Sequence, residues 1–296
     1  MSIIFLFIDG IGLGEEAEAN PLTQTNWESF EKLTDGKGLQ DSGTVRNESL
    51  LFTPVDATLG VEGLPQSGTG QASLFSGINA ARILGRHFGP YPHSKIKFLL
   101  EKKSLFHKLM KEGYQPHFIN AYPDIFFEKM SSRNRWTCTT LMAKSAGLNL
   151  NGLMELQEGR SITAEIIQRA WRERLDLEVE KISPEQAGER LLSVAESYDL
   201  VMYEYFLTDK AGHSMDMKMS NRVLSILNRF LNHIIEGKER ETTLVLCSDH
   251  GNLENLSVKT HTRNPVPLIV FGPKAHRIKR ADSITDVPGI ILQLLK

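Results

Sequence analysis

The sequence predicts an α/β protein built on a mostly parallel sheet. Three apolar runs lead into an aspartate, namely residues 3–8 before Asp9, 200–207 before Asp209 and 244–247 before Asp249. Helical patterns alternate with these strand-like runs, which is the order that builds a parallel sheet. Because functional groups collect beyond the carboxyl ends of parallel strands, the same runs also predict the position of a site.

The remaining elements are predicted from local patterns. Strands are also expected at residues 116–121 and 267–271, and helices at 27–33, 70–76, 104–112, 162–175, 183 onward and 220–236. Ser104 and Ser183 are typical N-caps, and Ser183 is followed by Pro184 and by Gln186 at the capping-box position. Between 162 and 175, the isoleucines and Trp171 recur at helical spacing, which favours an amphipathic helix.

The chain is expected to form a metal-binding catalytic core from residues 1–122 and 183–296. Residues 123–182 are expected to form an inserted lid or cap over the active edge of the sheet. The length of 296 residues and the hydrophobic content of 41% are enough for one sizeable core with a subdomain.

Composition excludes several classes of partner. A net charge of −2 gives no field that would attract nucleic acid. Two cysteines are too few for a disulfide framework, and the first apolar run is too short for a signal peptide, so a cytoplasmic protein without membrane association is expected. The sequence indicates no oligomeric state.

Acidic and imidazole side chains are expected to meet at one edge of the sheet. The aspartates at the strand ends are joined there by His213, His250 and His261. Carboxylates packed in a cleft of low dielectric repel one another, and divalent cations are the usual compensation. A ligand set so rich in imidazole suits two borderline cations, either Mn or Zn.

A nucleophile is indicated in the stretch from Leu64 to Gln71. Its glycines allow the backbone to approach a ligand closely, and a helix beginning near Gly70 would direct free N–H groups at a phosphate. Ser67 and Thr69 share a face of an extended chain, so alternation alone does not distinguish their hydroxyls.

These motifs, in their order along the chain, resemble those of the alkaline phosphatase superfamily. The matching motifs are Asp9-Gly10, Ser67-x-x-Gly70, Asp209-x-x-x-His213, Asp249-His250-Gly251-Asn252-x-Glu254 and His261-Thr262-x-Asn264-Pro265-Val266-Pro267. Within that superfamily, the chain is most similar to cofactor-independent phosphoglycerate mutases and phosphopentomutases. The resemblance implies a three-layer α/β/α fold.

The resemblance also implies roles for these residues. One metal ion would be held by Asp9, Ser67, Asp249 and His250, and the other by Asp209, His213 and His261. Ser67 would be transiently phosphorylated during turnover of a small phosphorylated substrate. Both mutase families have Gly-His after the nucleophile, where this chain has Gly70-Gln71.

The reaction itself is left open by the sequence. A phosphatase or phosphomutase is the preferred interpretation. The alternatives are a phosphodiesterase, phosphonate hydrolase or sulfatase on the same scaffold, and a catalytically silent metal-binding module. Substrate contacts are expected from Thr69 and Gln71 beside the nucleophile and from the guanidinium groups of Arg133 and Arg135.

Overall fold

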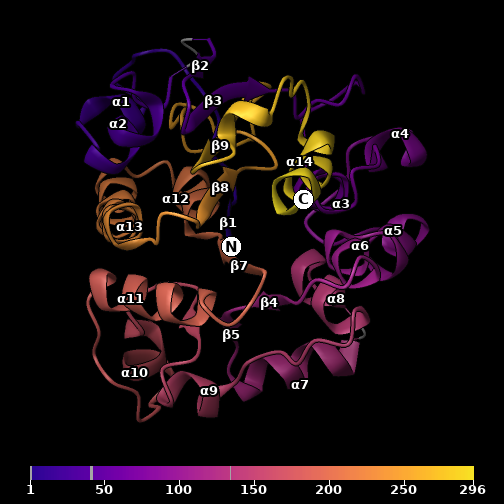
Figure 1. Ribbon diagram of the computed structural model, residues 1–296, viewed down its shortest axis with the longest axis vertical. Helices are drawn as coiled ribbons and strands as arrows, with labels where there is room; N and C mark the ends of the chain where they lie inside the picture. The colour runs from indigo at the N-terminus through magenta and orange to yellow at the C-terminus, as the bar shows by residue number, and fades with distance from the viewer. Residues whose placement is uncertain (1, 41–42, 134) are drawn as a thin grey trace.

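A seven-stranded sheet forms the centre of the molecule (Figure 1). The computed structural model describes residues 2–40, 43–133 and 135–296. The strands, in the order β2-β3-β9-β8-β1-β7-β4, are Val45–Arg46, Leu50–Val55, Val266–Phe271, Thr243–Cys247, Ile3–Ile8, Leu200–Tyr205 and Pro116–Phe118. The four strands β8, β1, β7 and β4 are parallel, whereas β9 runs antiparallel to β8 and to β3. The predicted α/β class with a mostly parallel sheet is confirmed.

Helices cover both faces of this sheet and give three layers. One face packs against α3, α5, α6, α8 and α14, which are Ser67–Ser76, Lys97–Lys102, Leu105–Lys111, Cys138–Ser145 and Val287–Leu295. The other packs against α2, α11 and α13, which are Glu28–Thr34, Pro184–Ala195 and Met217–Gly237. Side chains alternate along β1, so that Phe5 and Phe7 enter the first layer and Ile4 and Leu6 the second.

Short elements complete the chain. The other helices are α1 Pro21–Gln24, α4 Ala80–Leu84, α7 Asp124–Arg133, α9 Leu153–Gln157, α10 Arg169–Leu175 and α12 Leu207–Ser214, with 3₁₀ turns at Ser94–Ile96, Ala275–Arg277 and Ile284–Asp286. Strands β5 (Asn120–Ala121) and β6 (Ile162–Thr163) form a separate two-stranded sheet. Among the described residues, no helix is both long enough and apolar enough to cross a membrane.

The prediction of one helix over residues 162–175 was wrong. Ile162 and Thr163 instead pair with β5, and the Tyr203 hydroxyl donates a hydrogen bond of 2.9 Å to the Thr163 carbonyl. Ile166 and Gln168 then adopt positive φ angles of 69° and 58°, which a helix does not accommodate, so α10 begins only at Arg169. Tertiary strand pairing therefore outweighed the helical spacing of the isoleucines.

Two predicted strands end earlier than their apolar runs. The run 116–121 is divided between β4 and β5, since the Ile119 N–H still donates to Met202 of β7 while its carbonyl accepts from Ile162. The run 200–207 ends at Tyr205, and its last residue begins helix α12. This early end matters for the site, because it places Asp209 and His213 one turn apart on a helix.

The segment 123–182 contains both peripheral and deeply buried parts. Helix α8 contributes Cys138, Leu141 and Met142 to the buried cluster that also holds β1 and α3, whereas Met154 of α9 is 60% exposed. The division into a core and an inserted lid stays a prediction, and these two methionines provide a test of it.

Replacing Met142 with alanine should lower the free energy of unfolding by about 2–5 kcal/mol, because the substitution leaves a cavity in a packed core. The matched control, Met154→Ala, should change it by less than about 0.5 kcal/mol. Urea denaturation of both variants provides the measurement. Equal, small effects would show that α8 belongs to a separable lid.

Candidate metal centre

Four neighbouring strands bring the predicted ligands to one edge of the sheet. Asp9 follows β1 and Asp249 follows β8, while Asp209 lies in the first turn of α12 just after β7. These three strands are adjacent and parallel, so their carboxyl ends coincide. His261 precedes β9, and because β9 is antiparallel to β8 its beginning lies at that same edge.

The first cluster of side chains surrounds His250. Its Nε2 atom lies 3.0 Å from the Ser67 hydroxyl and 3.4 Å from both Asp9 Oδ1 and Asp249 Oδ2. All four residues are buried, and ligand atoms of Asp9, Asp249 and His250 lie within 4.8 Å of one another. They are the residues that the resemblance assigns to one cation.

The second cluster is centred on Asp209. Its carboxylate lies 3.4 Å from His213 Nε2 and 3.5 Å from His261 Nε2, and these two ring nitrogens are 3.1 Å apart. The Nδ1 atoms lie 2.8 Å and 2.7 Å from the backbone carbonyls of Lys259 and Pro65. Because a carbonyl only accepts, each Nδ1 carries a proton, and in the neutral rings both Nε2 lone pairs are directed into the cluster.

Burial dominates the electrostatics of the first cluster. Burial, followed by repulsion from Asp249 and Asp209, raises the pKa of Asp9 well above its ordinary 3.8. Burial also raises the pKa of Asp249 to about 7 and lowers the pKa of His250 to about 3. At Asp209, burial is outweighed by the hydrogen bond with His213 and by the nearby His250, so its pKa falls to about 2.

These observations fit two divalent cations. Asp9 Oδ1 and both carboxylate oxygens of Asp249 are buried and receive no hydrogen bond from any residue that the structure describes. In the second cluster, the Nε2 atoms of His213 and His261 and the Asp209 carboxylate converge at distances of 3.1 to 3.5 Å. Unpaired buried acceptors of this kind are costly, and a cation beside each cluster would stabilise them. Carboxylate and imidazole together suit Mn or Zn better than Ca.

Two residues that sequence reasoning did not assign hold the second cluster in place. The Asn252 amide donates to Asp209 Oδ1 at 2.6 Å and to the Asp209 carbonyl at 3.1 Å. The buried Glu254 carboxylate accepts from the N–H groups of Gly12 and Asn252 and from the side chains of Thr262 and Asn264. Both residues belong to the quoted Asp249 motif, which was the available signal.

Helix α3 begins at Ser67 and fixes the hydroxyl beside His250. Gly70 is required there, since a Cβ atom would lie 2.8 Å from the Asp249 carbonyl oxygen, and a Cβ on Gly68 would lie 2.4 Å from that of Tyr91. The close approach of α3 to the loop after β8 therefore depends on Gly70, and its close approach to the backbone of Tyr91 depends on Gly68. The N-terminus of a helix also favours a bound anion.

The predicted substrate residues lie at different distances from this centre. Gln71 lines the adjoining cavity and donates a bond of 3.2 Å to Asp9 Oδ2. Thr69 is fully buried, and its hydroxyl bonds to the backbone of Phe88 and Gln66. Arg133 is exposed at the end of α7, and the Arg135 guanidinium lies 4.3 Å from the centre of the Tyr91 ring. Of the four predicted substrate residues, Gln71 therefore contacts the first cluster, whereas Thr69, Arg133 and Arg135 contact neither cluster.

A cavity of about 500 Å³ opens beside Asp9, Ser67 and Asp209. It also contacts Glu204, a residue of β7 that sequence reasoning missed although it is the one charged residue of an otherwise apolar run. Glu204 Oε2 accepts hydrogen bonds from Thr139 at 2.7 Å and from Tyr122 at 3.4 Å. Burial raises the pKa of Glu204 to about 7.

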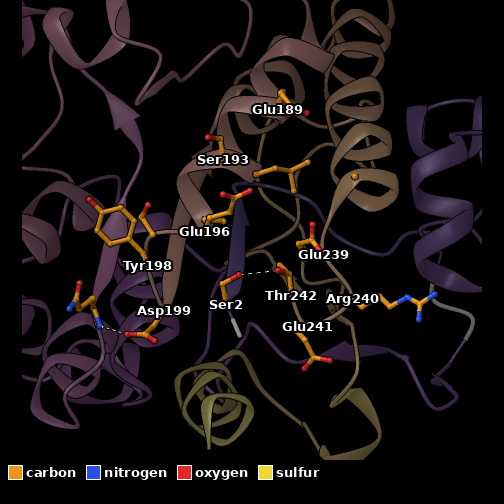
Figure 2. A pocket seen from close by; sticks show the side chains of 15 residues that line it. Ser2, Glu189, Ser193, Glu196, Tyr198, Asp199, Glu239, Arg240, Glu241 and Thr242 are labelled. Carbon is orange, nitrogen blue, oxygen red and sulfur yellow. Dashed lines mark hydrogen bonds between the residues drawn. The ribbon is translucent and has the colours of Figure 1, made fainter.

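A second, larger cavity of about 870 Å³ lies at the opposite edge of the sheet (Figure 2). Ser2, Asp199 and Thr242, which line it, precede the parallel strands β1, β7 and β8. Its walls are rich in glutamate and contain none of the clustered ligands. Both ligand clusters therefore lie at the carboxyl edge, away from this cavity.

Comparisons with known proteins agree with this fold. Residues 173–296 match the family model of the metalloenzyme superfamily. The chain is 31% identical over 123 residues to the 2,3-bisphosphoglycerate-independent phosphoglycerate mutase of Desulforudis audaxviator, covering 39% of this chain and 24% of that protein. It is 27% identical over 128 residues to the enzyme of the same name from Cereibacter sphaeroides, covering 40% and 25%. The match thus spans about a quarter of the length of these relatives.

Solved structures with the same fold match almost the whole chain. The PH0037 protein of Pyrococcus horikoshii gives a TM-score of 0.60 at 14% identity, covering 99% of this chain and 96% of that one. The alkaline phosphatase of the Antarctic bacterium TAB5 gives 0.56 at 11% identity, covering 99% and 97%. The fold is thus that of alkaline phosphatase.

The α/β/α fold and the two ligand clusters are those expected of a metalloenzyme. More particularly, residues 173–296 are similar to the metalloenzyme superfamily, about two-fifths of the chain resembles 2,3-bisphosphoglycerate-independent phosphoglycerate mutases, and the fold is that of alkaline phosphatase. The family-model match includes Asp209, His213, Asp249, His250 and His261. Asp9 and Ser67 lie outside the matched residues, and the folded chain places them beside Asp249 and His250.

Metal loading should give two Mn²⁺ or Zn²⁺ ions per chain. Asp249→Asn and Asp209→Asn should each lose a different ion, because each removes a charge from one cluster, and the double variant should bind neither. Native mass spectrometry and elemental analysis measure the content, with the exposed Glu16→Gln as the matched control. Full occupancy in the double variant would contradict the assignment.

Glu204 predicts a pH dependence of stability. Its folded pKa of about 7 lies above its ordinary 4.5, so its contribution is fully present below pH 4.5 and is lost as the pH rises through 7. Between pH 4.5 and 8, the free energy of unfolding of wild type should fall by up to about 3 kcal/mol relative to Glu204→Gln. Urea titrations in the presence of a chelator test this, and a constant difference would show that folding does not raise the pKa of Glu204.

Proposed function

We propose that this protein is a two-metal phosphoryl-transfer enzyme that acts on a small phosphomonoester through a phosphoserine at Ser67. One observation carries the proposal: the Ser67 hydroxyl lies at the beginning of α3, 3.0 Å from His250 and beside a cavity that reaches both ligand clusters. The similarity to phosphoglycerate mutases and the alkaline phosphatase fold support it.

The residues of the chain have separable roles in this reaction. Asp9, Asp249 and His250 would hold one cation beside Ser67, and Asp209, His213 and His261 would hold the other. When bound, two cations neutralise charge on the attacking, leaving and non-bridging oxygens of the transition state. Gln71 orients the Asp9 carboxylate through its hydrogen bond, and Asn252 orients Asp209 in the same way.

Turnover then takes two displacements at phosphorus. In the first, Ser67 Oγ loses its proton and forms a bond to phosphorus while the ester oxygen of the substrate leaves and takes up a proton. In the second, the oxygen of an acceptor O–H group forms a bond to phosphorus and loses its proton, while the Ser67 Oγ–P bond breaks and Ser67 Oγ takes up a proton. Water as acceptor gives a phosphatase, and a hydroxyl of the bound substrate gives a mutase.

Ser67→Ala should lower kcat by several orders of magnitude and leave the fold intact, because it removes only the attacking oxygen. Thr69→Ala should lower kcat much less, since the Thr69 hydroxyl contacts backbone rather than the cavity. Acid quench during turnover followed by peptide mapping locates the covalent phosphate. Phosphate on Thr69, or an active Ser67→Ala variant, would refute the mechanism.

A further inference from the structure

The cavity beside the metal ligands has a wall unlike that expected for phosphoglycerate. Five of its lining side chains are aromatic, namely Tyr91, Tyr122, Phe126, Trp171 and Phe206. Tyr122 and Phe126 are stacked with ring centres 4.2 Å apart. Rings held in this way offer a flat apolar surface, which is suited to an apolar group of similar shape.

Positive charge is scarce on the same wall. Among the described residues that line the cavity, Lys210 is the one cationic side chain, and its ammonium group lies 4.5 Å from the centre of the Phe206 ring. Arg135 is placed outside, against the Tyr91 ring and in a small neighbouring cavity. A substrate carboxylate would therefore find no guanidinium group to pair with.

Glu204 makes the wall still less suitable for an anion. The residue is 6% exposed, and both of its side-chain hydrogen bonds from described residues go to Oε2, so Oε1 receives none. In either protonation state this carboxyl group offers no positive charge to a second carboxylate. Placing two carboxylates together in a buried cavity is unfavourable.

We infer that the cavity selects phosphomonoesters whose alcohol part is a flat, uncharged aromatic group, and that it discriminates against carboxylate-bearing esters such as phosphoglycerates. This inference rests on the proposed function, because it places the phosphoryl group at Ser67 and the alcohol part against the aromatic wall. The similarity to phosphoglycerate mutases would then extend to the metal centre but not to the substrate.

Three phosphate esters of primary alcohols separate these properties. Benzyl phosphate carries a ring, glycerol 3-phosphate is small and neutral in its alcohol part, and 3-phosphoglycerate adds a carboxylate. With the metal-loaded protein, kcat/KM for benzyl phosphate should exceed that for glycerol 3-phosphate by at least about tenfold, with 3-phosphoglycerate the poorest. Equal values, or 3-phosphoglycerate as the best substrate, would overturn the inference while leaving the proposed function standing.

Two variants assign the selectivity to the wall. Phe126→Ala should reduce the ratio of benzyl phosphate to glycerol 3-phosphate turnover by about tenfold, because the ring then loses an apolar contact. Its neighbour Ile125, 44% exposed on the same helix, provides the control Ile125→Ala, which should leave the ratio unchanged. Glu204→Gln should raise the relative rate with 3-phosphoglycerate. Unchanged ratios in both Phe126→Ala and Glu204→Gln would contradict the assignment.

Binding distinguishes failure of this inference from failure of the proposed function. Titration calorimetry with benzylphosphonate, which cannot be hydrolysed, should show tighter binding than phosphonoacetate, and Phe126→Ala should weaken the first selectively. If none of the three esters is turned over, the proposed function fails, and the calorimetry alone decides the selectivity. Equal binding of the two phosphonates would refute the inference.

Discussion

Two aspartates with unsatisfied oxygens are buried side by side, and the rest of the site depends on how they are accommodated. Asp9 and Asp249 follow adjacent parallel strands, so the pairing of β1 with β8 forces them together. Burial raises the pKa of both carboxyl groups, which means that the fold alone does not stabilise their charges. Cations bound there would remove this cost, and the surrounding imidazoles would complete their ligand sets. The proposed metal centre would thus be a consequence of strand order.

The supporting contacts give this arrangement its rigidity. The Glu254 carboxylate accepts hydrogen bonds from three separate stretches of the chain, which contain Gly12, Asn252, and Thr262 with Asn264. Asn252 in turn fixes the Asp209 carboxylate by donating a hydrogen bond to it. The backbone carbonyls of Pro65 and Lys259 orient the rings of His261 and His213, respectively. A phosphoryl-transfer site needs such fixed positions, because its catalysis consists mainly of positioning and charge neutralisation.

The candidate metal ligands could be predicted from the sequence more readily than the residues that line the adjoining cavity. Asp9, Asp209 and Asp249 were visible because each ends an apolar run, and that pattern requires no knowledge of distant contacts. His261 precedes β9, so it lies at the carboxyl edge only because β9 runs antiparallel to β8. The sequence does not show that strand direction. The helix expected at 162–175 failed because pairing of Ile162 with Asn120 is a long-range contact that local spacing does not contain. Glu204 was hidden for the same reason, since its partners Thr139 and Tyr122 come from distant parts of the chain.

The most direct test of the account is anomalous diffraction from crystals of the Mn²⁺- or Zn²⁺-loaded protein. Two peaks per chain are expected, one bounded by Asp9, Asp249 and His250 and the other by Asp209, His213 and His261. A single peak, or peaks away from the carboxyl edge of β8, β1 and β7, would contradict the claim that strand order creates a two-metal centre.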